Sequence, residues 1–391
     1  MKSLIDSLVY MFRVLVIFLV LISLNACGSS SQAQVQDRLF PTISVDFIDH
    51  YELPKQTFQK TPVGGLSGIT YNPRTNSFYT ISDDRSQNAP ARFYTLDIKL
   101  KAKEDTAEIA DVRLKDVTFL KTEQGDNFPR GEIDAEGIAL APGNNLLISS
   151  EGNTDQEINP FIKRFDLETG KVQQTLPLRK RFLLPETEED APRGVRNNLG
   201  FESLTLNPSG VMSPEGDPFR VFTATESSLI QDQLPSESEE QTRIRFLHYV
   251  VNPIGQPLPI AEHLYLLDEP PLGTVGNGLT EVLAIQPEGY FLTLERSYGL
   301  SGYGAKLFLM TIGNATDTSG VETFNVDLGG LQPVRKKQLF DFADLDFTIY
   351  NLEGLAVGPT LPDGSQSLFV ISDDNFNEQE VTQLLLFRLQ T

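Results

Sequence analysis

The sequence lacks tryptophan and holds one cysteine and three histidines among 391 residues. A single cysteine excludes an intramolecular disulfide, so the stability of the fold must come from its core. None of His50, His248 and His263 lies in a repeated motif, which argues against a histidine-ligated zinc site or a histidine general base. "GLSGI" and "GLSGY" each miss the last glycine of G-x-S-x-G, and "GTVGNG" has the wrong spacing for a phosphate-binding loop.

Positive charge is also scarce, because 32 lysines and arginines face 53 acids and the net charge is −21. This charge argues against nucleic acid and anionic membrane surfaces as partners, and it favours cations. Hydrophobic residues make up 40 % of the chain, which is enough to bury a sizeable core. The aromatic residues are 25 phenylalanines and 11 tyrosines, a composition that suits strands more than helices.

The N-terminus has the features of an export signal. The apolar run "VLVIFLVLIS" follows Lys2 and Arg13 and is too short for a comfortable membrane span. It ends in "LNAC", which resembles a bacterial lipobox with Cys27 as the lipidated residue. We therefore predict a lipoprotein signal peptide over 1–27, a flexible tether over 28–40 and one domain over 41–391. The protein would be anchored in the bacterial cell envelope, with the lipid as its only membrane contact; an ordinary signal peptide with an incidental cysteine is the alternative.

A short motif recurs five times, as "GLSGITYNP", "DAEGIALAP", "GFESLTLNP", "GLTEVLAIQP" and "NLEGLAVGP". The prolines that close it are separated by 69, 66, 79 and 72 residues. A period near 70 over the whole domain indicates a repeat architecture.

Each repeat contains four short apolar runs that read as strands, except the fifth, which stops after its third. The segment 41–53 can supply the missing strand by pairing with 381–390 and closing a ring. We therefore predict an all-β fold, a β-propeller of five four-stranded blades. Six blades would fit if the insertion "SSLIQDQLPSESEEQ" hides strands. Two stacked β-sandwiches would not explain one period from end to end.

Acidic residues open the first strand and close the second strand of most repeats. These two positions lie at the same end of a β-hairpin, so we expect the acids to converge on one mouth of the central channel. We call the position that opens the first strand the first column and the position that closes the second strand the second column. The first column holds Glu136, Glu202, Glu281 and Glu353, with Ser67 in the first repeat. The second column holds Asp83, Asp84, Glu151, Glu226, Glu295, Asp373 and Asp374. The segments "RGEIDAEG" and "RGVRNNLGFE" add Glu132, Asp134 and Asn198.

So many carboxylates cannot share one site as free anions, because two like charges ~4 Å apart repel by about 4 kcal/mol at an effective dielectric of ~20. Arginines are too few to neutralise them: Arg85, Arg130, Arg193, Arg196 and Arg296. Hard divalent cations, with Ca²⁺ as the hypothesis, would complete the neutralisation. The predicted metal ligands are Asp83, Asp84, Asp134, Glu136, Glu151, Glu226, Glu281, Glu295, Glu353, Asp373 and Asp374. The alternative is structural, with the repeated glutamates bonded to backbone groups of the next blade.

The motifs "GLSGI…FYTISDD", "DAEGIAL", "NLGFESL", "LERS" and "NLEGLAV…ISDDN" resemble the phytase-like family, described as having esterase-like activity of phytase, over about 60–391. The resemblance implies a β-propeller, bacterial export and phosphoester hydrolysis. The chain is more distantly similar to the calcium-dependent propeller phytases, in which acid-bound calcium ions bind phosphates and activate water. That similarity implies the same role for the acids named above.

Two functional hypotheses follow. In the first, a metal-dependent phosphoesterase acts on a small phosphorylated or ester substrate. Its catalytic residues would be Glu136, Glu202 and Arg296, and Arg85, Arg130, Arg196 and Asn198 would bind the substrate. In the second, a non-catalytic propeller binds a ligand or a protein partner at the acidic mouth.

Overall fold

The computed structural model describes residues 40–391 apart from 104–105, 188, 215, 236–240 and 253. The predicted signal peptide, Cys27 and all of the predicted tether except residue 40 lie outside the described residues. Within the described part of the chain, no helix combines the length and the apolar character needed to cross a membrane.

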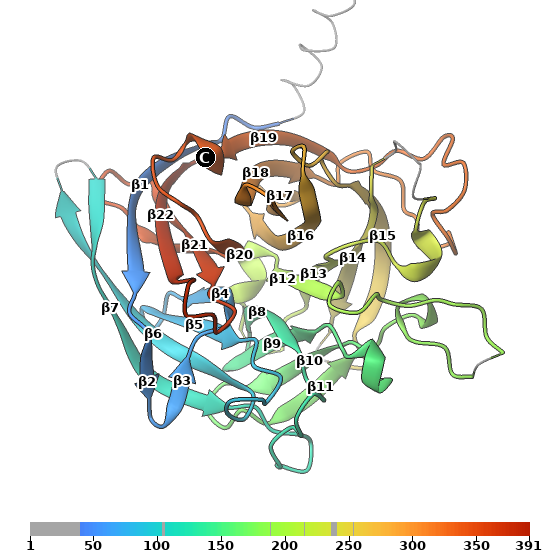
Figure 1. Cartoon of the computed structure of the whole chain (residues 1–391), viewed down its shortest axis with the longest axis horizontal. Coiled ribbons are helices and arrows are strands. Elements are labelled where there is room, and N and C mark those ends of the chain that lie inside the picture. The colour runs from blue at the N-terminus through green and yellow to red at the C-terminus, as the bar shows by residue number, and fades with distance from the viewer. Residues whose placement is uncertain (1–39, 104–105, 188, 215, 236–240, 253) are drawn as a thin grey trace, which may run out of the picture. The chain divides into compact units, whose positions relative to one another are not determined.

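Residues 44–390 form five antiparallel sheets of four strands, arranged as the blades of a ring (Figure 1). The first blade consists of β4 (Leu66–Asn72), β5 (Ser77–Ser82), β6 (Arg92–Lys103) and β7 (Thr106–Phe119). The second consists of β8 (Ala135–Ala141), β9 (Asn145–Ser150), β10 (Phe161–Asp166) and β11 (Val172–Leu176). The third consists of β12 (Phe201–Leu206), β13 (Phe219–Thr225), β14 (Arg243–Val251) and β15 (Leu258–Leu266). The fourth consists of β16 (Thr274–Ile285), β17 (Tyr290–Gly299), β18 (Gly302–Thr311) and β19 (Arg335–Asp341). The fifth consists of β20 (Asn351–Thr360), β21 (Gln366–Asp373), β22 (Thr382–Gln390) and β1 (Ser44–Leu53).

Elements outside the blades are short. A small hairpin joins β2 (Gln56–Phe58) to β3 (Thr61–Val63). The described helices are η1 (Thr154–Gln156), η2 (Lys180–Phe182), α2 (Pro208–Val211), η3 (Ile230–Asp232) and η4 (Phe342–Asp344). The described residues of the insertion after β13 contain only η3, so this segment adds no sixth blade.

The motif strands are the innermost strands and contact one another around the ring. β4 contacts β8 and β20, β12 contacts β8 and β16, and β16 contacts β20. The prediction of a five-bladed β-propeller is confirmed.

The ring is closed as predicted by strands from both ends of the domain. β1 pairs antiparallel with β22, from Ser44 opposite Gln390 to Leu53 opposite Thr382. The outer edge of β1 lies against β7, where the amide of Ile109 donates to Asp49 Oδ2 at 2.8 Å. This contact covers an edge that would otherwise be free to pair with another chain.

The hydrophobic core lies between the blades, because each sheet buries both faces against its neighbours. One cluster joins the first and fifth blades and includes Phe78 and Phe369, whose rings lie 4.9 Å apart. Similar clusters join the first to the second blade, the second to the third and the third to the fourth. The acids at the ends of the innermost strands are therefore held on a packed scaffold.

Candidate functional site

Each innermost strand carries an irregularity in its pairing at the repeated motif. The residues skipped by the register are Ser67 with Gly68, Glu136 with Gly137, Glu202, Thr280 and Glu353. A bulge bends the strand and redirects the side chain of the extra residue. It occurs in all five blades at the repeated motif, and in the fourth blade the first strand begins to pair earlier, at Thr274.

In each blade, one residue at or near the end of the second strand faces a residue in the segment that opens the first strand. The facing pairs are Gly65 with Asp83, Asp134 with Glu151, Gly200 with Glu226, Gly278 with Arg296, and Asn351 with Asp373. At Gly278 a Cβ atom would lie 2.2 Å from Glu226 Oε1 of the preceding blade. Glycine at this position therefore lets Glu226 approach the fourth blade.

The bulge residues and the facing pairs together bring eight carboxylates close to one another, and we call these eight acids the acidic ring. Its members are Asp83, Asp134, Glu136, Glu151, Glu202, Glu226, Glu353 and Asp373. The interactions between them run around the channel and return from Asp373 to Asp83. All are buried except Asp83, whose side chain is 24 % exposed. Solvent therefore reaches the acidic ring on the side of the first blade.

Two groups within the acidic ring have the spacing of metal ligands. Asp83, Asp134 and Glu136 form one group, and Glu151, Glu202 and Glu226 form the other. In each group the carboxylate oxygens all lie within 4.8 Å of one another. These six acids could therefore hold metal ions. Five of them are among the predicted metal ligands, and the sixth, Glu202, is predicted as a catalytic residue.

Burial and mutual repulsion raise the pKa values of the acidic ring. Burial, followed by the charge of Glu226, raises the pKa of Glu151 to about 8. Burial, followed by the charge of Glu151, raises the pKa of Asp134 to about 6. The pKa values of Glu136 and Glu202 are raised well above the usual range, first by burial and then by neighbouring carboxylates. In the absence of cations, part of the acidic ring must therefore be protonated at neutral pH.

Arg85 links three blades at the exposed side of the acidic ring. Its Nε donates to Asp134 Oδ1 at 2.6 Å, and its Nη2 donates to Asn198 Oδ1. Arg85 lies just after β5 with a φ of +47°, a backbone conformation that few arginines adopt. This strained turn points the guanidinium across the second blade. The predicted residues Arg85, Asp134 and Asn198 are thus brought together.

Arg296 occupies the position that holds an acid in the other four blades. Its Nη2 donates to Glu226 at 3.1 Å and to Glu353 at 3.4 Å. Burial lowers the pKa of Arg296, but Glu226 and Glu353 outweigh that effect and raise it above its usual range. Its buried Nε has no hydrogen-bond partner among the described residues, so one strong donor remains available.

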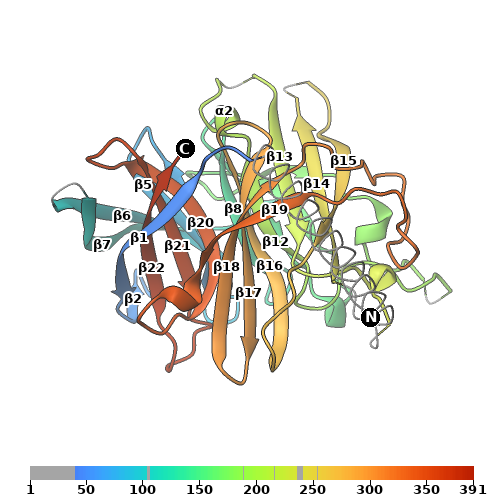
Figure 2. The ribbon, with the colours of Figure 1, turned by 90° about the horizontal axis from the view of Figure 1, so that it is seen from above.

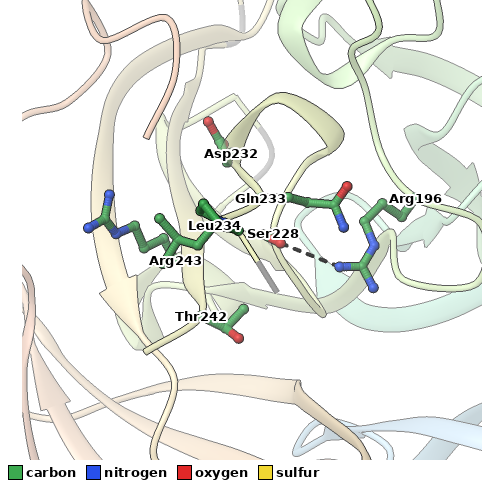
Figure 3. A pocket seen from close by; sticks show the side chains of 8 residues that line it. Arg196, Ser228, Asp232, Gln233, Leu234, Thr242 and Arg243 are labelled. Carbon is green, nitrogen blue, oxygen red and sulfur yellow. Dashed lines mark hydrogen bonds between the residues drawn. The ribbon is translucent and has the colours of Figure 1, made fainter. Parts of the chain in front are cut away.

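Arg196 lines a cavity of about 190 Å³ beside the acidic ring (Figure 3). Its Nη1 lies 3.5 Å from Ser228 Oγ, at the long limit of a hydrogen bond, and Glu226 is its nearest charged neighbour. Asp232 and Arg243 also line the cavity but are engaged elsewhere. Asp232 pairs with Arg245 at 2.6 Å, and Arg243 donates to backbone carbonyls such as Val326 O at 2.9 Å. Arg196 is therefore the lining cation best able to bind an anion.

The expectation that every acid faces one mouth needs correction for Asp84 and Asp374. Asp84 pairs with the buried Arg92 and accepts the amides of Asn88 at 2.8 Å and Ala89 at 3.0 Å. These contacts hold the loop that presents Asp83 and Arg85. Asp374 has the same position after β21.

Asp374 pairs with Lys55 at 2.9 Å and accepts the amides of Gly65 at 2.9 Å and Phe376 at 3.1 Å. In both "ISDD" motifs the first aspartate joins the acidic ring and the second holds the loop.

Glu281 and Glu295 are also outside the acidic ring, because the fourth repeat is shifted by one residue relative to the predicted columns. Glu281 accepts the amides of Leu204 at 3.2 Å and Val282 at 2.9 Å, which is the structural alternative stated above. Glu295 accepts from Tyr265 Oη and pairs with Lys336.

The remaining predicted residues lie at the surface or pair elsewhere. Arg130 and Glu132 are exposed, and Arg193 lies 3.7 Å from Asp190. One residue of the site was missed by sequence reasoning. Asn351 Nδ2 donates to Glu353 Oε1 at 2.7 Å, and its buried Oδ1 has no hydrogen-bond partner among the described residues. The signal was its place two residues before Glu353, the same offset that separates Asp134 from Glu136.

Residues 61–376 match the family described as "Phytase-like: Esterase-like activity of phytase". The chain belongs to the phytase-like family. The match covers the first four blades and strands β20 and β21 of the fifth, and every member of the acidic ring of this phytase-like protein lies within it. A search among curated proteins finds no match.

Several solved structures are similar to this phytase-like propeller over most of their length. The calcium-binding protein regucalcin from Agrobacterium tumefaciens is 11 % identical, with 86 % of this chain and 94 % of that chain covered and a TM-score of 0.33. A structure from work on GH130 mannoside phosphorylases and glycoside hydrolases is 10 % identical, with 83 % and 84 % covered and a TM-score of 0.42. The N-terminal domain of Nup159 is 11 % identical, with 89 % and 96 % covered and a TM-score of 0.33. These similarities concern the fold alone.

Proposed function

We propose that this phytase-like protein is a divalent-cation-dependent phosphoester hydrolase that acts at the acidic ring. The observation that carries the proposal is the pair of three-carboxylate groups, each with its oxygens within 4.8 Å, beside the guanidinium groups of Arg85 and Arg296. We further propose that the protein is exported and held in the bacterial cell envelope by a lipid on Cys27, as the N-terminal sequence predicts.

The donor set fits a hard divalent cation such as Ca²⁺. The two groups offer oxygen ligands only, which is the preference of calcium and magnesium. Asp83 Oδ1 is buried and has no hydrogen-bond partner among the described residues, and Asn351 Oδ1 is in the same state. Carboxylates also outnumber the nearby arginines, Arg85, Arg196 and Arg296, so bound cations would relieve repulsion that protons must otherwise relieve.

The roles of the residues follow from their positions. A bound cation would polarise the phosphoryl oxygens and lower the pKa of a water ligand. Arg85 is partly exposed and lies where solvent reaches the acidic ring, so it would bind the incoming phosphate together with Asn198. Arg296, through its unpaired Nε, would stabilise negative charge that develops on the phosphoryl group. Glu136 or Glu202, whose pKa values are raised, would accept a proton from the attacking water.

A second function, cation-dependent ligand binding without catalysis, is favoured by the burial of the acidic ring. Glu136 and Glu202 are 6 % and 7 % exposed, so a bulky substrate would not reach them without movement of the surrounding loops. In this case the acidic ring would hold cations, and only Asp83 and Arg85 would face a ligand.

An assay of residues 28–391 with p-nitrophenyl phosphate, with calcium and with chelator, separates the two functions. The hydrolase proposal expects calcium-dependent turnover that falls at least a hundredfold in Glu202→Gln and in Arg296→Lys. Glu123→Gln is the control, since this acid is exposed and distant from the motif columns. No calcium-dependent turnover in the parent, together with calcium-dependent binding of phosphate, would leave the binding function in its place.

A further inference from the structure

The fourth blade extends past the acidic ring, whereas the first three blades stop at it. Strands β5, β9 and β13 end at Ser82, Ser150 and Thr225, each one residue before its member of the ring. Strand β17 instead continues from Arg296 to Gly299 and turns directly into β18, and β16 begins early at Thr274 to pair with this extension. Figure 2 shows β16 and β17 reaching beyond the neighbouring strands. We call residues 270–276 and 297–303 the finger.

The tip of the finger is apolar and lies in solvent. Leu272, Val275 and Leu300 are 105 %, 78 % and 92 % exposed, and the finger contains no acidic or basic residue. The tip is ordered by the backbone, because the amide of Leu300 donates to Gly273 O at 3.3 Å. In a chain with a net charge of −21, an uncharged segment with exposed leucines indicates a surface that is covered in use.

Two tyrosines form the base of the finger, between its tip and the acidic ring. The rings of Tyr298 and Tyr303 lie 4.9 Å apart, and Tyr303 Oη lies 3.4 Å from Glu380 Oε2. Tyrosine is favoured where one end of the side chain is apolar and the other is hydrated, as at the head-group level of a bilayer. From tip to base, the finger thus changes from leucine to tyrosine, and the charged groups of the acidic ring follow beyond the base.

We propose that the finger inserts its leucines into a zwitterionic lipid bilayer and so places the acidic ring at the level of the lipid phosphates. The four-residue separation of Arg296 from Leu300 spans about 13 Å along an extended strand, enough for the leucines to enter the acyl layer while Arg296 stays among the head groups. The order of polarity along the finger matches that of a bilayer interface. A zwitterionic surface is required because the acidic chain would be repelled by anionic lipid. The inference stands whether or not the acidic ring is catalytic.

The proposed lipid anchor permits this orientation on the same membrane. Ser44 pairs with Gln390, the end of β22 far from the acidic ring, so the domain begins at the opposite end of the blades. The 16 residues between Cys27 and Ser44 can reach at most about 55 Å. The length of β1 and the finger together is about 46 Å. The 16-residue segment is therefore long enough to reach from Ser44, along the side of the propeller, to the level of the finger tip. Finger and anchor would then hold one membrane at two points.

Vesicle binding tests the proposal with residues 28–391, which carry no lipid. The parent should co-sediment with phosphatidylcholine vesicles in the presence of chelator. In the double variant Leu272→Ser/Leu300→Ser the partition coefficient should fall at least tenfold, because two apolar side chains no longer enter the acyl layer. The matched control is Ile254→Ser, since Ile254 is 89 % exposed and follows β14 at the other end of the blades. Melting temperatures of all three proteins verify that they are folded.

Each other outcome overturns the proposal. The finger is not a membrane contact if the parent does not bind vesicles, or if Ile254→Ser loses as much binding as the double variant. Binding that needs calcium and ignores the leucine substitutions would assign the contact to the acidic ring. Hexyl phosphate is the final probe, below its micelle-forming concentration. Leucine-dependent binding of hexyl phosphate without vesicle binding would assign the finger to a single amphiphilic ligand.

Discussion

Glutamates that look equivalent in the repeats have different surroundings in the fold. Glu202 lies among carboxylates, with Glu151, Glu226 and Glu353 raising its pKa after burial has done so. Burial also raises the pKa of Glu281 well above its usual range, but the groups beside it are backbone amides, which donate to its carboxyl group and lower its pKa in part. The first environment favours a cation, and the second is already satisfied by the protein.

Amide substitutions should separate these two roles. In the parent, calcium at a hundred times its Kd should stabilise the fold by about 2.7 kcal/mol, or roughly 5–10 °C in Tm. Glu136→Gln and Glu202→Gln should lose much of this gain and should be neutral or stabilising in chelator, because they relieve repulsion. Glu281→Gln is the comparison, and its effect should be equal with and without calcium. Thermal melts of the four proteins measure this, and an unchanged calcium gain in Glu202→Gln would contradict the metal site.

The raised pKa values predict an unusual dependence of stability on pH. Folding raises the pKa of Glu151 from 4.5 to about 8 and that of Asp134 from 3.8 to about 6. The folded state therefore holds these protons more tightly than the unfolded state. The resulting stability is fully present below the unfolded pKa values and is lost as the pH rises through the folded values.

In chelator, the free energy of unfolding should thus decline between roughly pH 5 and pH 8, by up to about 1.4 kcal/mol per pH unit for each proton released, and Tm should decline with it. Calcium should flatten the decline, because it neutralises the same carboxylates. Melting curves across this pH range test the expectation, and Glu151→Gln should show a shallower slope than the parent. A Tm that rises toward pH 8 in chelator would show that these acids are ionised in the fold.

At the scale of elements, the sequence predicted the blades better than the register within them. The proline period identified five repeats, and the missing strand of the fifth identified 41–53 as the closing strand. The fourth repeat misled because one extra residue separates its bulge from Pro287, so counting back from the proline selected Glu281 instead of Thr280. In the other repeats a small residue follows the bulge, namely Gly68, Gly137, Ser203 and Gly354. Glu281 is not followed by a small residue, and this signal was available in the sequence. Asp374 is held by Lys55 and Gly65, which are distant in the sequence, so no local pattern shows these partners. The partners of Asp84 lie in the loop that follows it, but the repeated acidic pair does not show which aspartate they hold.

The small residue that follows the bulge in four of the blades should be sensitive to substitution. At Gly137 a Cβ atom would lie 2.5 Å from Glu202 O and 2.6 Å from Ser149 Oγ, so Gly137→Ala must displace an innermost strand. We expect a loss of about 1–3 kcal/mol, seen as a lower midpoint in denaturant, together with a weaker calcium response. Gly320→Ala is the control, because no atom lies within 4 Å of its Cβ position. Equal stability of the two variants would mean that the innermost strands adapt without strain.

Ring closure by β1 can be tested by deletion. Removing residues 40–53 would leave the fifth blade with three strands and expose the edge of β22, including the pairing partners of Phe47 and Tyr51. Tm should fall by more than about 10 °C, with aggregation as an accompanying sign. Deleting 28–39 instead should leave Tm within about 1 °C, because the blades are built from residues 44–390. If the variant that lacks 40–53 has the Tm of the parent, β1 does not contribute to the stability of the propeller.

For the whole propeller, the direction of the strands places its first residue, Ser44, and the acidic ring at opposite ends of the blades. Ser44 pairs with Gln390, whereas Leu53 and Thr382 lie at the end where β21 reaches Asp373. A lipid on Cys27 would therefore attach the propeller from the face that carries no acidic ring. The ring would stay accessible to a soluble substrate when the finger is free, and it would face lipid when the finger is inserted.

The anchor itself is tested by fractionation of cells that produce the full-length chain. Cys27 is the only cysteine, so Cys27→Ser removes the thiol that a lipid would modify without disturbing a disulfide. The parent should sediment with membranes, and most of the variant should become soluble after signal-peptide removal. Mass analysis of the variant must show cleavage, since an uncleaved signal peptide would also hold it in the membrane. Because the finger supplies a second, weaker contact, part of the cleaved variant should remain on membranes, and adding Leu272→Ser/Leu300→Ser should release that part. A cleaved variant that sediments like the parent, with or without the leucine substitutions, would contradict a lipid anchor at Cys27.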